Sequence, residues 1–261
     1  MTTAPVPATR ADAAVGALAS AAAMPQPAPD GRDWRSYLPA IAAVTYLAAW
    51  AAGLAVWPVN LPINAAGAQV AASYQAHPAE AVAQYLLAEG LTGVMLGIVL
   101  AFAAFSRHRG QQTVRPWGAA ALGGLAVVVS VTQCVIGMFL TAAATRHDIA
   151  LAGNLSDLVN RLDGVKMLAL AGAAAWLAVT GNSGPAFPRW LQATGLLLAV
   201  AITASGLAYL TLSNALAWTA YVSGPLLLLW VTGTGIWLTV HRRRRTRGLR
   251  GSGQALAGTG W

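Results

Sequence analysis

Charged residues are scarce in this sequence. Only 9% of its 261 residues are charged, while 57% are hydrophobic, and a soluble domain carries about 25% charged residues. The mean hydropathy is +0.57. So little charge cannot cover the surface of a water-soluble globule, which excludes that class of fold.

Cysteine and catalytic motifs are also nearly absent. Cys134 is the single cysteine, so a disulfide within the chain is impossible. There is no HExxH, CxxC, GxSxG or P-loop sequence. The four histidines, His77, His108, His147 and His241, fall in loops or at the ends of apolar runs, which argues against a haem held by two histidines in the membrane. We therefore expect no cofactor and no metal.

Six long apolar runs make up most of the chain. They lie at residues 37–57, 84–105, 118–142, 164–181, 190–212 and 219–240. Each is close to the ~20 residues that a helix needs to cross the hydrocarbon core of a bilayer. A helix also pairs its backbone polar groups within its own segment, as lipid requires. The sequence predicts an all-α polytopic membrane protein with six transmembrane helices.

The basic residues predict the orientation of these helices. Thirteen of the 16 basic residues lie on one side of the runs, and only Arg146, Arg161 and Lys166 lie on the other. By the positive-inside rule, both termini are cytoplasmic. The net charge of +8 then reflects orientation, so we expect membrane lipid as a contact and no nucleic acid.

Composition divides the chain into three parts. Residues 1–34 are rich in Ala and Pro and are predicted to form a disordered cytoplasmic lead. A cleaved signal peptide is the alternative, although Asp12 lies beside its apolar stretch and no leucine-rich core follows. Residues 35–241 are the predicted six-helix transmembrane domain. Residues 242–261 form a basic cytoplasmic tail that attracts anionic lipid.

Two longer segments are predicted on the outer side. The one between the first and second runs is expected to form a short Ala-rich helix. The one between the third and fourth runs carries an apolar stripe at helical spacing, made by Leu151, Leu155, Leu158, Leu162 and Val165. We expect this helix to lie at the outer interface and to lead into the fourth transmembrane helix. Asp157 with Arg161, and Asp163 with Lys166, are spaced to pair on it.

Glu89 stands at the head of the apolar stretch LAEGLTGVMLGIVLAF. If the second helix begins near Tyr85, Glu89 lies ~6 Å below the outer boundary. An ionised carboxylate there needs a partner, and the nearest cations on that side are Lys166, Arg161 and Arg146. Two interpretations stay open. Glu89 is either a structural or headgroup-facing carboxylate, or a proton site, cation site or general acid lining an outward cavity.

Other polar residues lie within the apolar runs. Gln133, next to Ser130 and Thr132, should face another helix because lipid cannot satisfy its amide. Gly93 and Gly97 form a GxxxG spacing that permits close helix contact. We predict that the outer ends of the second, third and fourth helices enclose a small cavity. The candidate binding or acid–base residues around it are Glu89, Gln133, Asp157, Arg161 and Lys166.

The second half of the chain has a recognisable pattern. Pro188, Arg189, Trp190 and Leu191 form a turn before a Gly-rich fifth run, and the sixth run, rich in Trp, ends in arginines. With the looser LAEGLTGVMLGIVLAFAAF, residues 84–245 resemble an uncharacterised bacterial family of six-helix integral membrane proteins. The resemblance implies a six-helix bundle and supplies no activity or site residue. A chain rich in Ala, Gly and Arg with a single lysine is typical of GC-rich actinobacteria, which makes the plasma membrane the expected location.

Polar groups converging from separate helices favour binding or transport of a small or lipophilic compound. A metal-independent prenyl or terpenoid isomerase or cyclase, with Glu89 or Asp157 as its carboxylic acid, is the enzymatic alternative. A regulatory or assembly subunit of a membrane complex is the third. Whether the protein is an enzyme stays open at this point.

Overall fold

The computed structural model describes residues 34–57, 61–105, 115–179 and 187–257, with side chains up to residue 244. The chain divides into two units, Met1–Arg35 and Ser36–Trp261, and the second is described here. The predicted cytoplasmic lead lies outside the described residues, apart from its last position, as do the side chains of most of the predicted basic tail.

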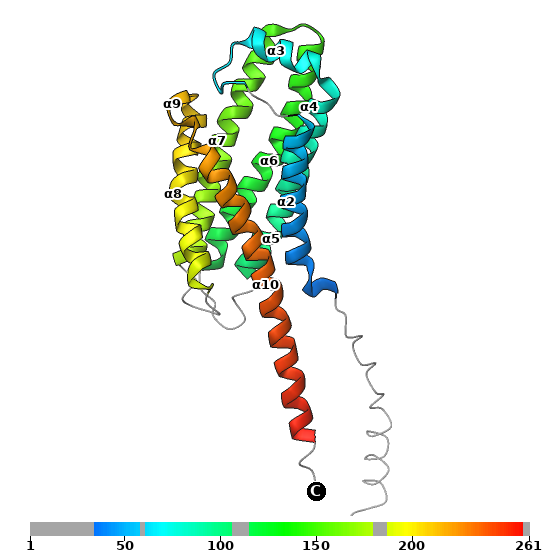
Figure 1. Cartoon of the computed structure of the whole chain (residues 1–261), viewed down its shortest axis with the longest axis vertical. Coiled ribbons are helices and arrows are strands. Elements are labelled where there is room, and N and C mark those ends of the chain that lie inside the picture. The colour runs from blue at the N-terminus through cyan, green and yellow to red at the C-terminus, as the bar shows by residue number, and fades with distance from the viewer. Residues whose placement is uncertain (1–33, 58–60, 106–114, 180–186, 258–261) are drawn as a thin grey trace, which may run out of the picture. The chain divides into compact units, whose positions relative to one another are not determined.

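All regular structure in the described residues is helical, and six spans are long and apolar enough to cross a membrane. Figure 1 shows these helices running beside one another in a bundle. The prediction of an all-α membrane protein with six spans is confirmed. The spans are Leu38–Val56, Pro78–Phe105, Trp117–Thr145, Ile149–Val179, Arg189–Thr211 and Ala220–Arg244. They belong to α2 (Leu38–Val56), α4 (Pro78–Tyr85) with α5 (Thr92–Phe105), α6 (Arg115–Thr145), α7 (Ile149–Val179), α8 (Arg189–Thr211) and α10 (Ala220–Ala257).

The second span begins earlier than predicted. It starts with α4 at Pro78, passes through a π-helical turn, η2 (Leu86–Leu91), and continues as α5. The expected start near Tyr85 is therefore wrong. Pro78 suits the first turn of a helix, where its missing N–H is not needed. The turns that follow contain polar residues and so do not stand out in the sequence as part of an apolar run. Ala81 and Tyr85 in these turns are nevertheless buried.

The third and fourth spans form a tight hairpin. Thr145 ends α6 and Ile149 begins α7, with His147 between them in the left-handed region at φ 60°. The Asp148 carboxylate accepts a hydrogen bond from the backbone N–H of Leu151 at 3.0 Å and caps α7. The stripe around Leu151 is thus the first half of one 31-residue helix. The expectation that this helix leads into the fourth transmembrane helix is confirmed, and the two form one continuous element.

The predicted short Ala-rich helix is confirmed as α3 (Gly67–Ala76). It lies across the end of the bundle at the α6–α7 hairpin (Figure 1), where Gly67 and Gly153 bring two backbones into contact. Tyr74 of α3 packs edge-on against Trp57, and its hydroxyl is 2.8 Å from that of Tyr85. These contacts fix α3 and the start of the second span to each other.

Apolar side chains cover the outside of the bundle as well as its core. Trp230 is 1% exposed in the core, whereas Val200 and Leu197 are 75% and 62% exposed. In the most apolar stretch of each span, between 33% and 44% of the residues are buried within the protein. The rest needs an apolar solvent, which the hydrocarbon of a bilayer supplies. Two short elements complete the described fold, η1 (Trp34–Ser36) and α9 (Asn214–Ala217).

Candidate functional site

Glu89 lies in the π-helical turn of the second span. It follows Pro78 by eleven residues, about 16 Å along the helix axis, so it lies further from the start of its span than the sequence suggested. A π-helical turn shifts the backbone hydrogen-bond register, and such turns occur frequently at functional sites. The side chain of Glu89 is 18% exposed, so its charge is largely removed from solvent.

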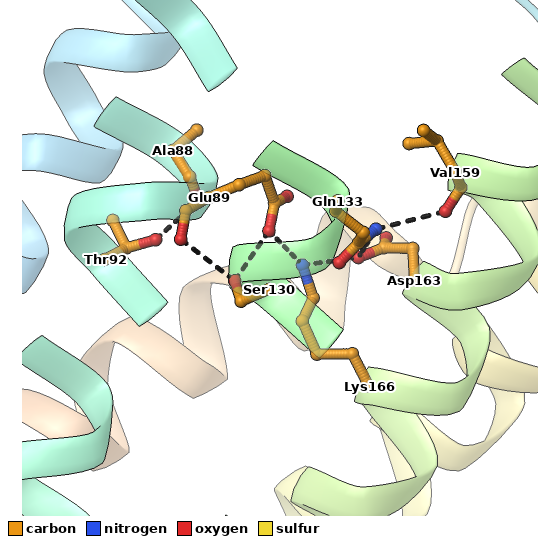
Figure 2. Close-up of polar contacts among 8 residues, drawn as sticks. All are labelled: Ala88, Glu89, Thr92, Ser130, Gln133, Val159, Asp163 and Lys166. Atoms are coloured by element: carbon orange, nitrogen blue, oxygen red, sulfur yellow. Dashed lines mark hydrogen bonds and ion pairs between the residues drawn. The ribbon is translucent and has the colours of Figure 1, made fainter. Parts of the chain in front are cut away.

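Lys166 joins Glu89 to a second carboxylate, that of Asp163. The Lys166 Nζ atom lies 2.6 Å from Glu89 Oε2 and 2.6 Å from Asp163 Oδ1. Figure 2 shows Lys166 reaching from its helix toward the carboxylate of Glu89. We call Glu89, Asp163 and Lys166 the charged triad. Glu89 comes from η2 and the other two from α7, so the triad ties two membrane spans together.

Helix α6 supplies two polar side chains to the triad. The Ser130 hydroxyl donates a hydrogen bond to Glu89 Oε2 at 2.8 Å. The Gln133 Nε2 group donates to the Val159 carbonyl oxygen at 3.1 Å and to Asp163 Oδ1 at 3.4 Å (Figure 2). Both partners of Nε2 are acceptors, which fixes the orientation of the amide. Gln133 thus faces another helix, as predicted.

Close packing of α5 on α6 brings Ser130 to the triad. A Cβ atom on Gly93 would lie 2.8 Å from the Cβ atom of Ser130, and one on Gly97 would lie 2.7 Å from Val127 Cγ2. Only a residue without a side chain fits at these separations. The predicted GxxxG contact is confirmed, and it holds the Ser130 hydroxyl beside Glu89.

Three tyrosines from separate helices interact electrostatically with the triad. Tyr46 of α2 and Tyr85 of α4 lie within electrostatic range of Glu89 and Asp163, and Tyr209 of α8 lies within range of Asp163 and Lys166. Tyr46 and Tyr85 are buried. These tyrosines bring both apolar ring area and hydroxyl groups to the neighbourhood of the triad.

Asp157 and Arg161 are not part of this group. Arg161 is exposed and donates a hydrogen bond to the Leu210 carbonyl oxygen at 3.2 Å. Within the described residues Asp157 makes no ion pair with it, and neither residue forms a hydrogen bond or ion pair with the triad. The structure thus brings together three of the five predicted residues, Glu89, Gln133 and Lys166.

Two members of the site were missed by the sequence reasoning. Asp163 was noted only as the i,i+3 partner of Lys166, a pairing that the structure confirms. Ser130 precedes Gln133 by three residues and so shares its helix face. Both spacings were visible, but nothing in the sequence showed that these faces of α6 and α7 meet at Glu89.

A second polar cluster lies between α8 and α10. The Ser205 hydroxyl, fully buried, is 2.9 Å from the hydroxyls of both Thr219 and Ser223. These hydroxyls satisfy one another and carry no charge. The cluster therefore acts as interhelical hydrogen bonding of the kind that holds membrane helices together.

Among the residues with described side chains, no three His, Cys, Asp or Glu residues are grouped so as to hold a metal ion. Cys134 is buried, with its Sγ atom 3.2 Å from where a Cβ on Gly90 would lie, and it packs as a core residue. No protein-family model matches the chain, and it has no significant match to a curated protein or to a solved structure.

Proposed function

We propose that the protein binds a small or lipophilic compound at the charged triad and carries it across the membrane. The observation that carries this proposal is that two carboxylates share one ammonium within membrane-spanning helices. With all three groups ionised, the triad has a net charge of −1. Ionisable residues inside membrane segments are costly and typically mark substrate or ion pathways.

A purely structural role explains this arrangement less well. Apolar residues of similar volume often stabilise a protein as much as a buried ion pair does, so stability alone does not call for these charges. A structural pair also needs one acid for one base, whereas here Asp163 adds a second acid. The π-helical turn at Glu89 adds a local irregularity in the second span, where transporters place their binding sites in interrupted helices.

The enzymatic alternative has less support. It requires Glu89 or Asp157 to protonate a prenyl substrate, but Glu89 Oε2 accepts hydrogen bonds from both Lys166 and Ser130. Those donors stabilise the ionised form and so oppose transfer of a proton from Glu89 to a substrate. Among the described residues, Asp157 forms no ion pair with the triad. No contact among the described residues favours a regulatory or assembly subunit.

Uptake into proteoliposomes tests the proposed function. The probes are radiolabelled alanine, glucose, succinate and benzylamine, which represent a zwitterion, a neutral solute, an anion and a cation. Glu89→Gln is compared with Glu80→Gln, because Glu80 is the other glutamate of the chain and its side chain is 46% exposed. We expect uptake of at least one probe that Glu89→Gln abolishes and Glu80→Gln preserves. Uptake that matches empty liposomes for every probe, or that both variants support equally, would contradict the proposal.

The location and orientation are part of the proposal. We place the protein in the plasma membrane with both termini in the cytoplasm, within the bacterial six-helix family that it resembles, and the distribution of basic residues supports the orientation. In a Cys134→Ser background, an impermeant maleimide applied to intact cells should label Gln75→Cys on the outside and leave Gln111→Cys unlabelled. The reverse pattern would overturn the orientation.

A further inference from the structure

Most of the hydrogen-bonding positions left over at the site are acceptors, beside one N–H of the three on Lys166 that has no acceptor among the described residues. Lys166 uses Nζ–H donors on Glu89 Oε2 and Asp163 Oδ1, and the Ser130 hydroxyl donates to Glu89. No hydrogen bond from the described residues reaches Oε1 of Glu89 or Oδ2 of Asp163. The site thus has unused oxygens on both of its carboxylates.

Gln133 provides an independent third acceptor. Its side chain is buried, with the residue 1% exposed, and its Oε1 atom has no hydrogen-bond partner. The amide cannot rotate to relieve this, because Oε1 would then face the Val159 carbonyl and the Asp163 carboxylate, which are both acceptors. A buried acceptor without a donor costs about 1–3 kcal/mol, and no described group, the third N–H of Lys166 included, donates to this oxygen in the structure.

Charge and hydrogen bonding together define what would complete the site. A proton shared by the carboxylates would neutralise the excess charge but leave the amide oxygen of Gln133 unpaired. A water molecule would pair that oxygen but leave the charge, so a proton and a water molecule would be needed together. A cation that carries N–H donors satisfies both, and a primary ammonium has three donors for the three unused acceptors. The tyrosines within electrostatic range of the triad add apolar ring area near the site.

We infer that the compound recognised at this site is an organic amine in its protonated form, held by Glu89, Asp163 and Gln133. This inference rests on the proposed function and specifies its substrate class. Lys166 neutralises one carboxylate and holds the two acids together, and the ligand ammonium neutralises the other. The recognition is then specific for a monocation with N–H donors, and it disfavours anions and neutral solutes.

Binding of four benzyl compounds to the protein in lipid nanodiscs tests the inference. Benzylamine, benzyltrimethylammonium, benzyl alcohol and benzoate share one ring and differ in charge and in donors. We expect benzylamine to bind most tightly at neutral pH. Glu89→Gln and Asp163→Asn, which keep the shape of the side chain, should each weaken it about tenfold or more, since each removes a charge-assisted hydrogen bond. Gln133→Met should weaken benzylamine severalfold and leave benzyl alcohol unchanged, and Glu80→Gln is the matched control.

Different failures have different meanings. Equal binding of benzylamine and benzyltrimethylammonium would show that the site does not recognise N–H donors, and would overturn the inference. Competition by sodium chloride but not by choline chloride would assign the site to a metal cation and overturn it as well. Glu89-dependent binding of benzyl alcohol or benzoate would refute the amine while leaving the proposed function standing. Absence of binding by all four compounds, together with absence of uptake of every transport probe, would remove both.

Discussion

Replacement of Lys166 by methionine is the perturbation whose effect follows most directly from the geometry. Lys166 is the single lysine of the chain, and methionine preserves the length of its side chain without the charge. At 2.6 Å from Nζ, each carboxylate interacts with the ammonium by roughly 6 kcal/mol at an effective dielectric constant of ~20. Most of this attraction offsets the cost of moving the charges out of water.

The net effect is therefore smaller than the Coulomb energy. Removing one partner from a buried charge pair costs about 3–5 kcal/mol, because an uncompensated charge remains. In Lys166→Met two carboxylates remain, and they repel each other. We expect the variant to lose about 3–5 kcal/mol of unfolding free energy. Combining it with Glu89→Gln and Asp163→Asn removes the stranded charges, so the triple variant should recover most of that loss.

The assay is unfolding in mixed micelles followed by fluorescence of the ten tryptophans. Arg161→Met is the matched control, because Arg161 is a base on the same helix whose side chain is exposed and, in the described part of the chain, bonds the Leu210 carbonyl alone. Its replacement should cost less than about 1 kcal/mol. Two results would refute the reasoning: a Lys166→Met variant as stable as the wild type, or a triple variant no more stable than Lys166→Met.

Three further predictions concern the bundle around the site. Gly97→Ala places a Cβ atom 2.7 Å from Val127 Cγ2 and should destabilise the protein by about 1–3 kcal/mol, whereas Gly124→Ala, with nothing within 4 Å, should leave unfolding free energy unchanged or raise it. Ser205→Ala removes the hydroxyl that two neighbouring hydroxyls contact and should lower the unfolding free energy by roughly 0.6–1.7 kcal/mol in the same assay. A variant more stable than the wild type would show that the cluster destabilises the bundle. Burial raises the pKa of Tyr74, so its contribution to stability is present below its unfolded pKa of ~10 and is lost as the pH rises through the higher folded value. Alkaline unfolding monitored by circular dichroism should occur at higher pH in Tyr74→Phe, and an unchanged midpoint would contradict this.

The membrane spans were predictable because lipid imposes one simple rule on the sequence. Long apolar runs and backbone pairing within a helix identify all six spans. Their ends were less predictable, since the first turns of the second span, from Pro78 to Tyr85, are packed by protein groups and carry polar residues. The same applies to the first half of α7, which continues as one helix through residues that resemble an interfacial segment.

The site was predictable only in part. Asp163 and Lys166 are three residues apart on one helix, so their pairing follows from local geometry. Glu89 and Lys166 are 77 positions apart, and their contact depends on how the second span packs beside α7. Asp157 and Arg161 have the same kind of local spacing as the real pair, but Arg161 reaches the end of α8 instead. Helix periodicity gives the faces of each helix, and tertiary packing decides which faces meet.

The most direct test of the account is the charge state of the triad. The excess negative charge exists only if Glu89 and Asp163 are both ionised beside the one ammonium of Lys166. Infrared difference spectra in lipid at neutral pH, wild type minus Glu89→Gln and wild type minus Asp163→Asn, report this for each carboxyl group. Carbon-13 labelling of glutamate simplifies the first spectrum, because Glu80 is the other glutamate of the chain. The account predicts that each substitution removes a carboxylate band and no carboxylic-acid band. A carboxylic-acid band lost in either variant would show that a proton already balances the site, and would contradict recognition of an amine by its excess charge.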